Sequence, residues 1–190
     1  MLVMAAALRQ NIHQLRCQNV DSRMFVPDEA LKQCATYDMI LGAVKDCGLE
    51  PFEIDDTVKA VFAGAKKVFA VLLLNHHEAL IKFFIRNDQL QSKQLDSKLP
   101  FSLSTLEKIM PTGASQFYEK QWEFTAPIFT KYTTHRVLDK DTILPFLESE
   151  KLSEGGFGMV YSIVIHPAHC KFAKTPSQCV LRGGLNRFNC

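Results

Sequence analysis

The fold of the C-terminal part is decided by one glycine-rich stretch, Leu152-Ser153-Glu154-Gly155-Gly156-Phe157-Gly158-Met159-Val160-Tyr161. The run from Met159 to Ile165 is β-branched and aromatic and is bounded by Gly158 and Pro167, which is typical of a strand. Glycines allow the tight turn that an antiparallel partner needs. We therefore predict a β-hairpin that follows Ile143–Leu147 and turns at the glycines, with a third strand at Cys179-Val180-Leu181.

Working outward toward the N-terminus, the pattern becomes helical. Residues 1–18 carry apolar side chains at helical spacing. A second helix is predicted to start at Val26-Pro27-Asp28-Glu29 and to end at Gly48, because proline and acids favour a helix start and glycine favours its end. A third is predicted to begin at Asp55-Asp56-Thr57, whose acids suit a helix N-terminus.

Between residues 66 and 129 the pattern is less uniform. Lys66–Leu74 fits either a buried strand or a buried helix, and Phe117–Phe129 fits either a short helix or an extended segment, with Trp122 in the core. Glu78–Arg86 is expected to be a buried helix, Asn87–Lys98 a surface loop, and Ser104-Thr105-Leu106-Glu107 a capping-box helix start. The predicted fold class is α+β, with a helical region at 1–132, a linker at 133–142 and a β-hairpin region at 143–190.

Composition narrows the class of protein. The chain has 190 residues, 47% hydrophobic and 22% charged, which is ordinary for a globular protein and excludes a disordered chain. The net charge of +2 gives no nucleic-acid footprint. The longest apolar run, Val68–Leu74, is far below the ~20 residues of a membrane span. Six cysteines without a Cys-x-x-Cys motif favour free thiols, so we expect an intracellular, cytoplasmic protein without membrane partners.

The glycine-rich stretch resembles the glycine-rich loop of protein kinases, which reads G-x-G-x-x-G-x-V between two antiparallel strands. Gly155, Gly158 and Val160 fall on the second glycine, the third glycine and the valine, and Ser153 replaces the first glycine. Kinases need glycine there because backbone N–H groups must approach phosphate oxygens closely. A plain hairpin with a permissive turn is the competing interpretation.

The resemblance extends beyond the loop to fungal protein-kinase-like proteins of the serine/threonine kinase superfamily. It is carried by Ile143-Leu144-Pro145-Phe146, by Ile165-His166-Pro167-Ala168-His169, and upstream by Phe117–Phe124 and Pro127-Ile128-Phe129. It implies ATP as the ligand, protein phosphorylation as the family activity, and an ATP site at Leu152, Ser153, Glu154, Gly155, Gly156, Phe157, Gly158, Val160 and Arg182. Leu152 and Val160 would cover the adenine. Arg182 stands where the family has its phosphate-binding lysine, and Lys171 and Lys174 are the alternatives.

The chain departs from the family downstream of the loop. It contains neither His-Arg-Asp, which supplies the catalytic base, nor Asp-Phe-Gly, which binds magnesium. We therefore predict no catalytic residues, no phosphotransfer by this chain, and Mg²⁺ only if a large lobe were present. Residues 143–190 would be an incomplete kinase small lobe, and we expect that a premature stop or a misjudged exon boundary explains its end. The alternative function is a helical interaction or regulatory module that binds no nucleotide; the protein partner or substrate is not identified.

Histidines and cysteines near the C-terminus include residue types that bind metals. The set His166, His169, Cys170 and Cys179 lacks the two close pairs of a zinc site, because the next cysteine after Cys179 is Cys190. No metal site is therefore predicted, and His76-His77 are interpreted as a helix start.

Overall fold

The structure is a computed structural model that describes residues 3–87, 90, 92–130, 137–155, 158–171 and 183–184. Within these residues it has eight α-helices and short strands in small sheets, so the predicted α+β class is confirmed. The α-helices are α1 (Val3–Leu15), α2 (Asp28–Cys34), α3 (Tyr37–Asp46), α4 (Pro51–Gly64), α5 (Lys66–Leu74), α6 (Ile81–Ile85), α7 (Leu103–Ile109) and α8 (Ala114–Gln121). The strands are β1 (Cys17–Gln18), β2 (Met24–Phe25), β3 (Phe129–Thr130), β4 (Phe146–Gly155), β5 (Gly158–Ile165), β6 (Cys170–Lys171) and β7 (Gly183–Gly184). No helix in the described part of the chain is both long and apolar enough to cross a membrane.

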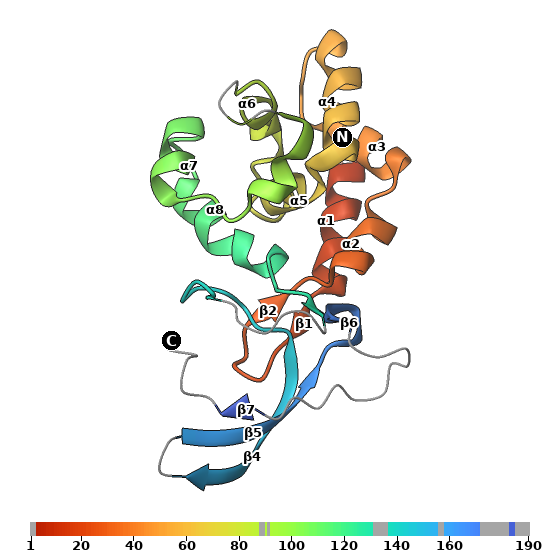
Figure 1. The fold of residues 1–190 in the computed structure, drawn as a ribbon. Helices are drawn as coiled ribbons and strands as arrows, with labels where there is room; N and C mark the ends of the chain where they lie inside the picture. The colour runs from red at the N-terminus through yellow and green to blue at the C-terminus, as the bar shows by residue number, and fades with distance from the viewer. Residues whose placement is uncertain are drawn as a thin grey trace.

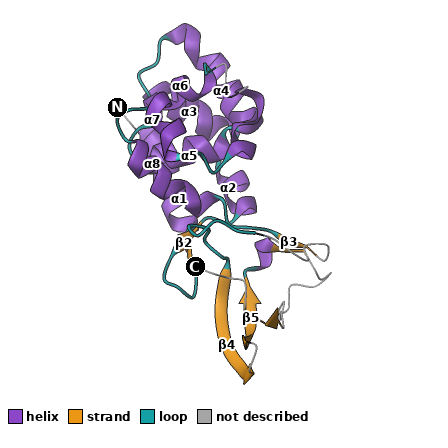
Figure 2. Ribbon diagram, turned by 60° about the vertical axis from the view of Figure 1, so that its left-hand side comes forward, coloured by secondary structure: helices purple, strands orange, loops and turns teal. Residues whose placement is uncertain are grey.

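The helices gather at one end of the molecule, and the β4–β5 hairpin projects from the other end (Figures 1 and 2). Strands β1 and β2 pair antiparallel, with Cys17 opposite Phe25, and lie between the two ends. Strand β3 pairs in parallel with β6, so the segment after α8 is joined to the segment after β5. Strands β3 and β6, which are far apart in the sequence, therefore connect the helical end with the hairpin.

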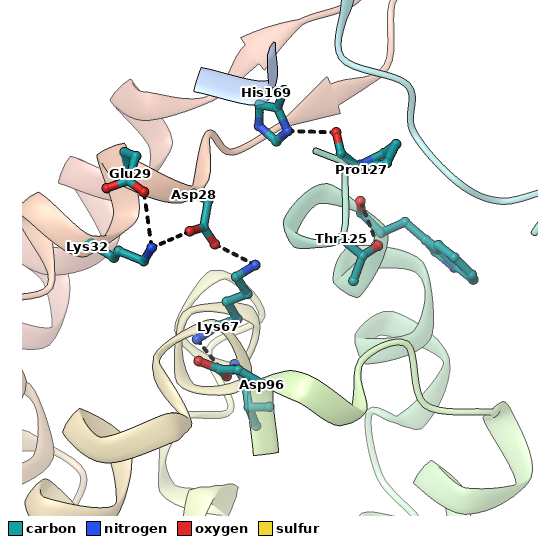
Figure 3. Close-up of polar contacts among 10 residues, drawn as sticks. Asp28, Glu29, Lys32, Lys67, Asp96, Thr125, Pro127 and His169 are labelled. Carbon is teal, nitrogen blue, oxygen red and sulfur yellow. Dashed lines mark hydrogen bonds and ion pairs between the residues drawn. The ribbon is translucent and has the colours of Figure 1, made fainter. Parts of the chain in front are cut away.

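Helix α5 forms the centre of the helical end, which resolves the ambiguity of the sequence in favour of a helix. Every residue from Val68 to Leu74 is buried. A helix that is apolar on all sides must be covered on all sides, and α1, α2, α4 and α8 all contact it. Its first turn is capped from outside, because the Asp96 carboxylate accepts hydrogen bonds from the Lys67 and Val68 N–H groups at 2.9 and 3.0 Å (Figure 3).

The polar stretch before α7 is not simply a surface loop. Ser92–Lys98 forms 3-10 turns, and Leu95 within it is fully buried. The prediction of a loop is wrong for these residues because one apolar side chain and one capping carboxylate, Asp96, tie the stretch to the core. The burial of Leu95 and the cap formed by Asp96 cannot be inferred from the composition of the stretch, because the neighbouring side chains are polar.

Several helix boundaries differ from the prediction. The segment expected to be one helix after Pro27 is two, because Thr36 interrupts it and its side chain accepts a hydrogen bond from the Met39 N–H. Its end at Gly48 is confirmed: this glycine has φ +69°, a left-handed conformation that glycine adopts without strain. Helix α4 begins at Pro51, before the predicted Asp55, because Glu50 and Glu53 form a capping box there.

For the later helices, too, the predicted helical segments contain helices, but the observed boundaries differ from the predicted ones. Ser102, and not Ser104, caps α7 by accepting a hydrogen bond from the Thr105 N–H. The segment predicted as one helix over Glu78–Arg86 is a 3-10 turn at Glu78–Leu80 followed by α6. The aromatic stretch contains α8, a 3-10 turn at Trp122–Phe124 and then β3. Trp122 is buried at 4% exposure, as predicted.

The segment that leads into the hairpin is anchored to the helical end at several points. Tyr118 donates a hydrogen bond to the Asp141 carboxylate at 3.1 Å. Arg23 donates to the Asp141 carbonyl at 2.6 Å, and the Asn19 side chain donates to the Leu144 carbonyl at 3.0 Å. The described end of the predicted linker is therefore held by side chains of the β1–β2 turn and of α8.

Candidate functional site

The predicted glycine-rich hairpin is present. Strands β4 and β5 pair antiparallel from Phe146 opposite Ile165 to Gly155 opposite Gly158. Only Gly156 and Phe157 separate the last pair, and these two residues lie outside the described part of the chain. Turns of two residues favour glycine because they require positive φ angles. Gly155 and Gly158 thus form the last pair before the turn, where the sequence predicts glycines.

A β-bulge lies next to the turn. Lys151 pairs with Tyr161 and Ser153 pairs with Val160, which leaves Leu152 as the extra residue of β4. A bulge turns the extra side chain away from the regular alternation and increases the local twist. Leu152 is 48% exposed, and Val160 on the neighbouring strand is half-buried. The two side chains that the family resemblance assigns to the adenine are therefore close to the turn and accessible to solvent.

The two faces of the hairpin differ. On β5, Ile163 and Ile165 pack with Phe129 and Phe146, and Tyr161 packs against this cluster. Because side chains alternate along a strand, the opposite face of β5 carries Val160, Ser162 and Val164, which are all half-buried. One face of β5 is therefore covered by Phe129 of β3 and Phe146 of β4. The other face is partly exposed to solvent.

The charges on the hairpin are mainly acidic. Glu154 forms an ion pair with Lys151 across the bulge. Glu148 and Glu150 are exposed, and within the described residues neither makes an ion pair. An anionic ligand at the turn would therefore depend on backbone N–H groups, because the only lysine of the hairpin is already paired with a carboxylate.

A third strand lies beside β5, in the sheet order β4-β5-β7. Gly183 pairs with Tyr161 and Gly184 pairs with Val160. The predicted strand at 179–181 and the predicted phosphate-binding residue Arg182 lie outside the described residues. Of the predicted site, the structure thus brings Leu152, Ser153, Glu154, Gly155, Gly158 and Val160 together, and it leaves Gly156, Phe157 and Arg182 untested.

The sequence did not indicate the cluster that joins the hairpin to the helices. Phe25 is fully buried, and its ring lies edge-on to those of His166 and His169 at 5.5 and 5.4 Å. His169 Nδ1 lies 3.1 Å from the Pro127 carbonyl (Figure 3), so the neutral ring donates from Nδ1. Its Nε2 is buried without a hydrogen-bond partner among the described residues. The parallel pairing of β3 with β6 and the hydrogen bond from the Val26 N–H to the Glu123 carbonyl help to bring these segments together.

Burial lowers the pKa of His166 and of His169. In the unfolded chain a histidine titrates near pH 6.5, so below that pH protons bind the unfolded state more readily than the folded state. Stability should therefore fall as the pH drops from 7.5 to 5.5, when it is measured by urea denaturation. His169→Asn, which keeps a donor near Pro127 but cannot titrate, should show a weaker pH dependence.

The exposed His76 provides the matched control for this pH dependence. His76→Asn should keep the pH dependence of the wild type. If His169→Asn and the wild type lose the same stability on acidification, the buried histidine is not the cause.

Metal chemistry receives no support in the described part of the chain, where no group of three or more histidine, cysteine or acidic residues could hold an ion. Cys17, Cys34 and Cys47 carry free thiols. Cys170 is disulfide-bonded, so the prediction of free thiols is wrong at this position. A disulfide sulfur has no thiolate to offer a metal, and Cys179 lies outside the described residues.

A separate hollow of about 390 Å³ lies between α4 and α6, at the end of the molecule away from the hairpin. Its wall includes Phe52, Lys82 and the ion pair between Glu53 and Arg86. The segments 78–86 and 117–129 also contribute to the core: Phe84 and Phe117 are fully buried, and their stacked rings have centroids 5.2 Å apart.

Comparison of the chain with protein-family models, with curated proteins and with solved structures found no match.

Proposed function

We propose that this chain binds ATP at the β4–β5 hairpin, in the manner of the first strands of a protein-kinase-like small lobe. The observation that supports the proposal is the pairing of Gly155 with Gly158 across a two-residue turn, followed by Val160 on the partly open face of β5. The antiparallel order β4-β5-β7 agrees with a small-lobe sheet in which a third strand follows the hairpin.

The proposed binding mode follows from the chemistry of the hairpin. Glycines let backbone N–H groups approach phosphate oxygens, because no Cβ blocks the approach. The adenine would lie against Leu152 and Val160, which bury apolar surface when the ring covers them. Arg182 immediately precedes β7, and in this proposal it takes the role of the phosphate-binding cation.

Phosphotransfer is not part of the proposed activity of these 190 residues. Kinases take the substrate proton with the aspartate of His-Arg-Asp and bind magnesium with that of Asp-Phe-Gly, and neither tripeptide occurs in the sequence. Without these groups a bound nucleotide lacks a base and a metal clamp. The proposed function is therefore nucleotide binding.

Thermal unfolding with and without ATP tests the proposal. A ligand at ten times its Kd stabilises the native state by about 1.4 kcal/mol, which corresponds to a rise in Tm of roughly 3–5 °C for a chain of this size. We expect this rise for the wild type and its loss in Leu152→Asp, which places a carboxylate at the proposed adenine site. Gly158→Val should also lose it, because the added side chain blocks the phosphates.

Leu147→Asp is the matched control, since Leu147 lies on the same strand, is 37% exposed and is remote from the turn. This variant should keep the full ATP-dependent rise. A folded wild type whose Tm does not respond to ATP would contradict the proposal and favour the helical interaction module. Equal responses in Leu152→Asp and Leu147→Asp would place the nucleotide elsewhere.

A further inference from the structure

Among the described residues, none pairs with the outer edge of β4 beyond its base. On its inner side β4 pairs with β5, and β4 is the edge strand of the sheet. At its base the Phe146 carbonyl accepts a hydrogen bond from the Val20 N–H at 2.9 Å. From Leu147 to Gly155, no backbone group of the described residues pairs with this edge. Between the register shifts at Leu147 and Leu152, such an edge presents every second N–H and C=O to an incoming strand.

Two carboxylates stand beside this edge on one face of the sheet. Glu148 lies opposite Val164 and Glu150 lies opposite Ser162, so their side chains share the partly open face. Both are exposed, and neither has an ion-pair partner among the described residues. An added strand with cations at alternate positions would place two of them beside these carboxylates, because its side chains also alternate.

The same charges disfavour pairing with a second copy of this chain. If two β4 edges paired, their acidic side chains would face one another, and like charges on neighbouring strands destabilise a sheet. Opposite charges on neighbouring strands stabilise it. The β4 edge therefore disfavours pairing with the β4 edge of a second copy and favours pairing with a basic strand.

We propose that the outer edge of β4 binds an extended basic peptide as an added β-strand, with lysine or arginine at every second position. Backbone hydrogen bonds along Glu148–Lys151, the regular stretch between the two register shifts of β4, supply the affinity, and Glu148 and Glu150 select the charge. This interaction goes beyond the proposed nucleotide binding, which uses the turn, Leu152 and Val160.

Fluorescence anisotropy tests the proposal with the full chain and a labelled nine-residue peptide of alternating lysine and valine. We expect saturable binding that depends on the peptide backbone. Two N-methylated peptides, methylated at alternate amides in opposite registers, separate strand addition from simple charge attraction. An added strand uses only every second amide, so one register should lose binding and the other should keep it.

Two pairs of substitutions test the role of the carboxylates. E148K/E150K should weaken binding about tenfold or more, because two favourable cross-strand pairs become repulsive. The isosteric Glu148→Gln/Glu150→Gln variant should weaken it in the same direction without risk to the fold. E107K/E119K changes the net charge equally at exposed positions of α7 and α8 and should leave the affinity within about twofold.

Three results would overturn the proposal. The first is the absence of saturable binding to the wild type. The second is an equal response to both N-methylated registers, which would indicate electrostatic attraction without strand pairing. The third is an equal loss of affinity in E107K/E119K and in E148K/E150K.

Discussion

Replacing Phe25 with alanine is expected to lower the free energy of unfolding by about 3–5 kcal/mol, the usual cost of removing a buried aromatic ring. The ring has no solvent exposure. It packs in one cluster with Trp122 and Ile143 and contacts both His166 and His169. The substitution would therefore leave a cavity at the point where the helical end meets the base of the hairpin.

Urea denaturation of wild type and Phe25→Ala measures this effect, and hydrogen exchange locates it. We expect the amides of β4 and β5 to lose protection, because the cluster at Phe25 holds the base of the hairpin. Phe52→Ala is the matched control, since Phe52 is 77% exposed and undergoes the same change in composition. It should stay within about 0.5 kcal/mol of the wild type. Equal losses in the two variants would show that Phe25 has no special structural role.

Asp28→Asn is expected to cost about 2 kcal/mol at pH 7. Asp28 forms ion pairs with Lys32 at 2.7 Å and with Lys67 at 2.6 Å, and so joins α2 to α5 (Figure 3). Burial alone would raise the pKa of Asp28, but hydrogen bonds and charges from both lysines lower it from 3.8 to about 2. A difference of this size corresponds to about 2 kcal/mol of stability in the ionised state.

The pH dependence of this effect follows from the lowered pKa. The ionised carboxylate stabilises the folded state above pH 3.8, and this contribution is lost as the pH falls from 3.8 toward 2. Urea denaturation at pH 7, 5, 4, 3 and 2 should therefore show the difference between the wild type and Asp28→Asn falling to roughly half at pH 3 and nearly vanishing near pH 2.

Asp55 offers the matched control, because it forms an ion pair with Lys59 on the exposed face of α4. Asp55→Asn should leave the free energy of unfolding unchanged within error, since exposed pairs contribute little. If Asp28→Asn also has no effect at pH 7, or if its full cost persists at pH 2, the half-buried bridge between α2 and α5 does not stabilise the fold.

Local signals predict part of this fold well. The glycine at 48, the proline at 27 and the β-branched run from Met159 to Ile165 act through their own backbone preferences, and the structure places a helix end, a helix start and a strand there. The caps of α1 and α5 could not be predicted in this way. Asp46 accepts hydrogen bonds from Met4 and Ala5, and Asp96 caps α5 from outside, so both caps depend on tertiary contacts.

In the candidate site, too, some features could be predicted from local sequence and others could not. The glycine turn was predictable because two-residue hairpin turns favour glycine through their own backbone angles. The bulge at Leu152 was not, because a bulge reflects how two strands align and leaves little trace in one of them. The cluster of Phe25, His166 and His169 was also hidden, since its members come from segments separated by about 140 residues of chain.

Photoaffinity labelling with 8-azido-ATP tests the central proposal most directly, because the azide reacts with whatever surrounds the adenine. The full chain would be irradiated with the reagent, digested and mapped by mass spectrometry, with and without excess ATP. We predict a modified peptide that contains Leu152–Val160 and whose labelling ATP suppresses. Labelling that ATP suppresses only in other peptides, or no labelling that responds to ATP, would contradict nucleotide binding at the hairpin.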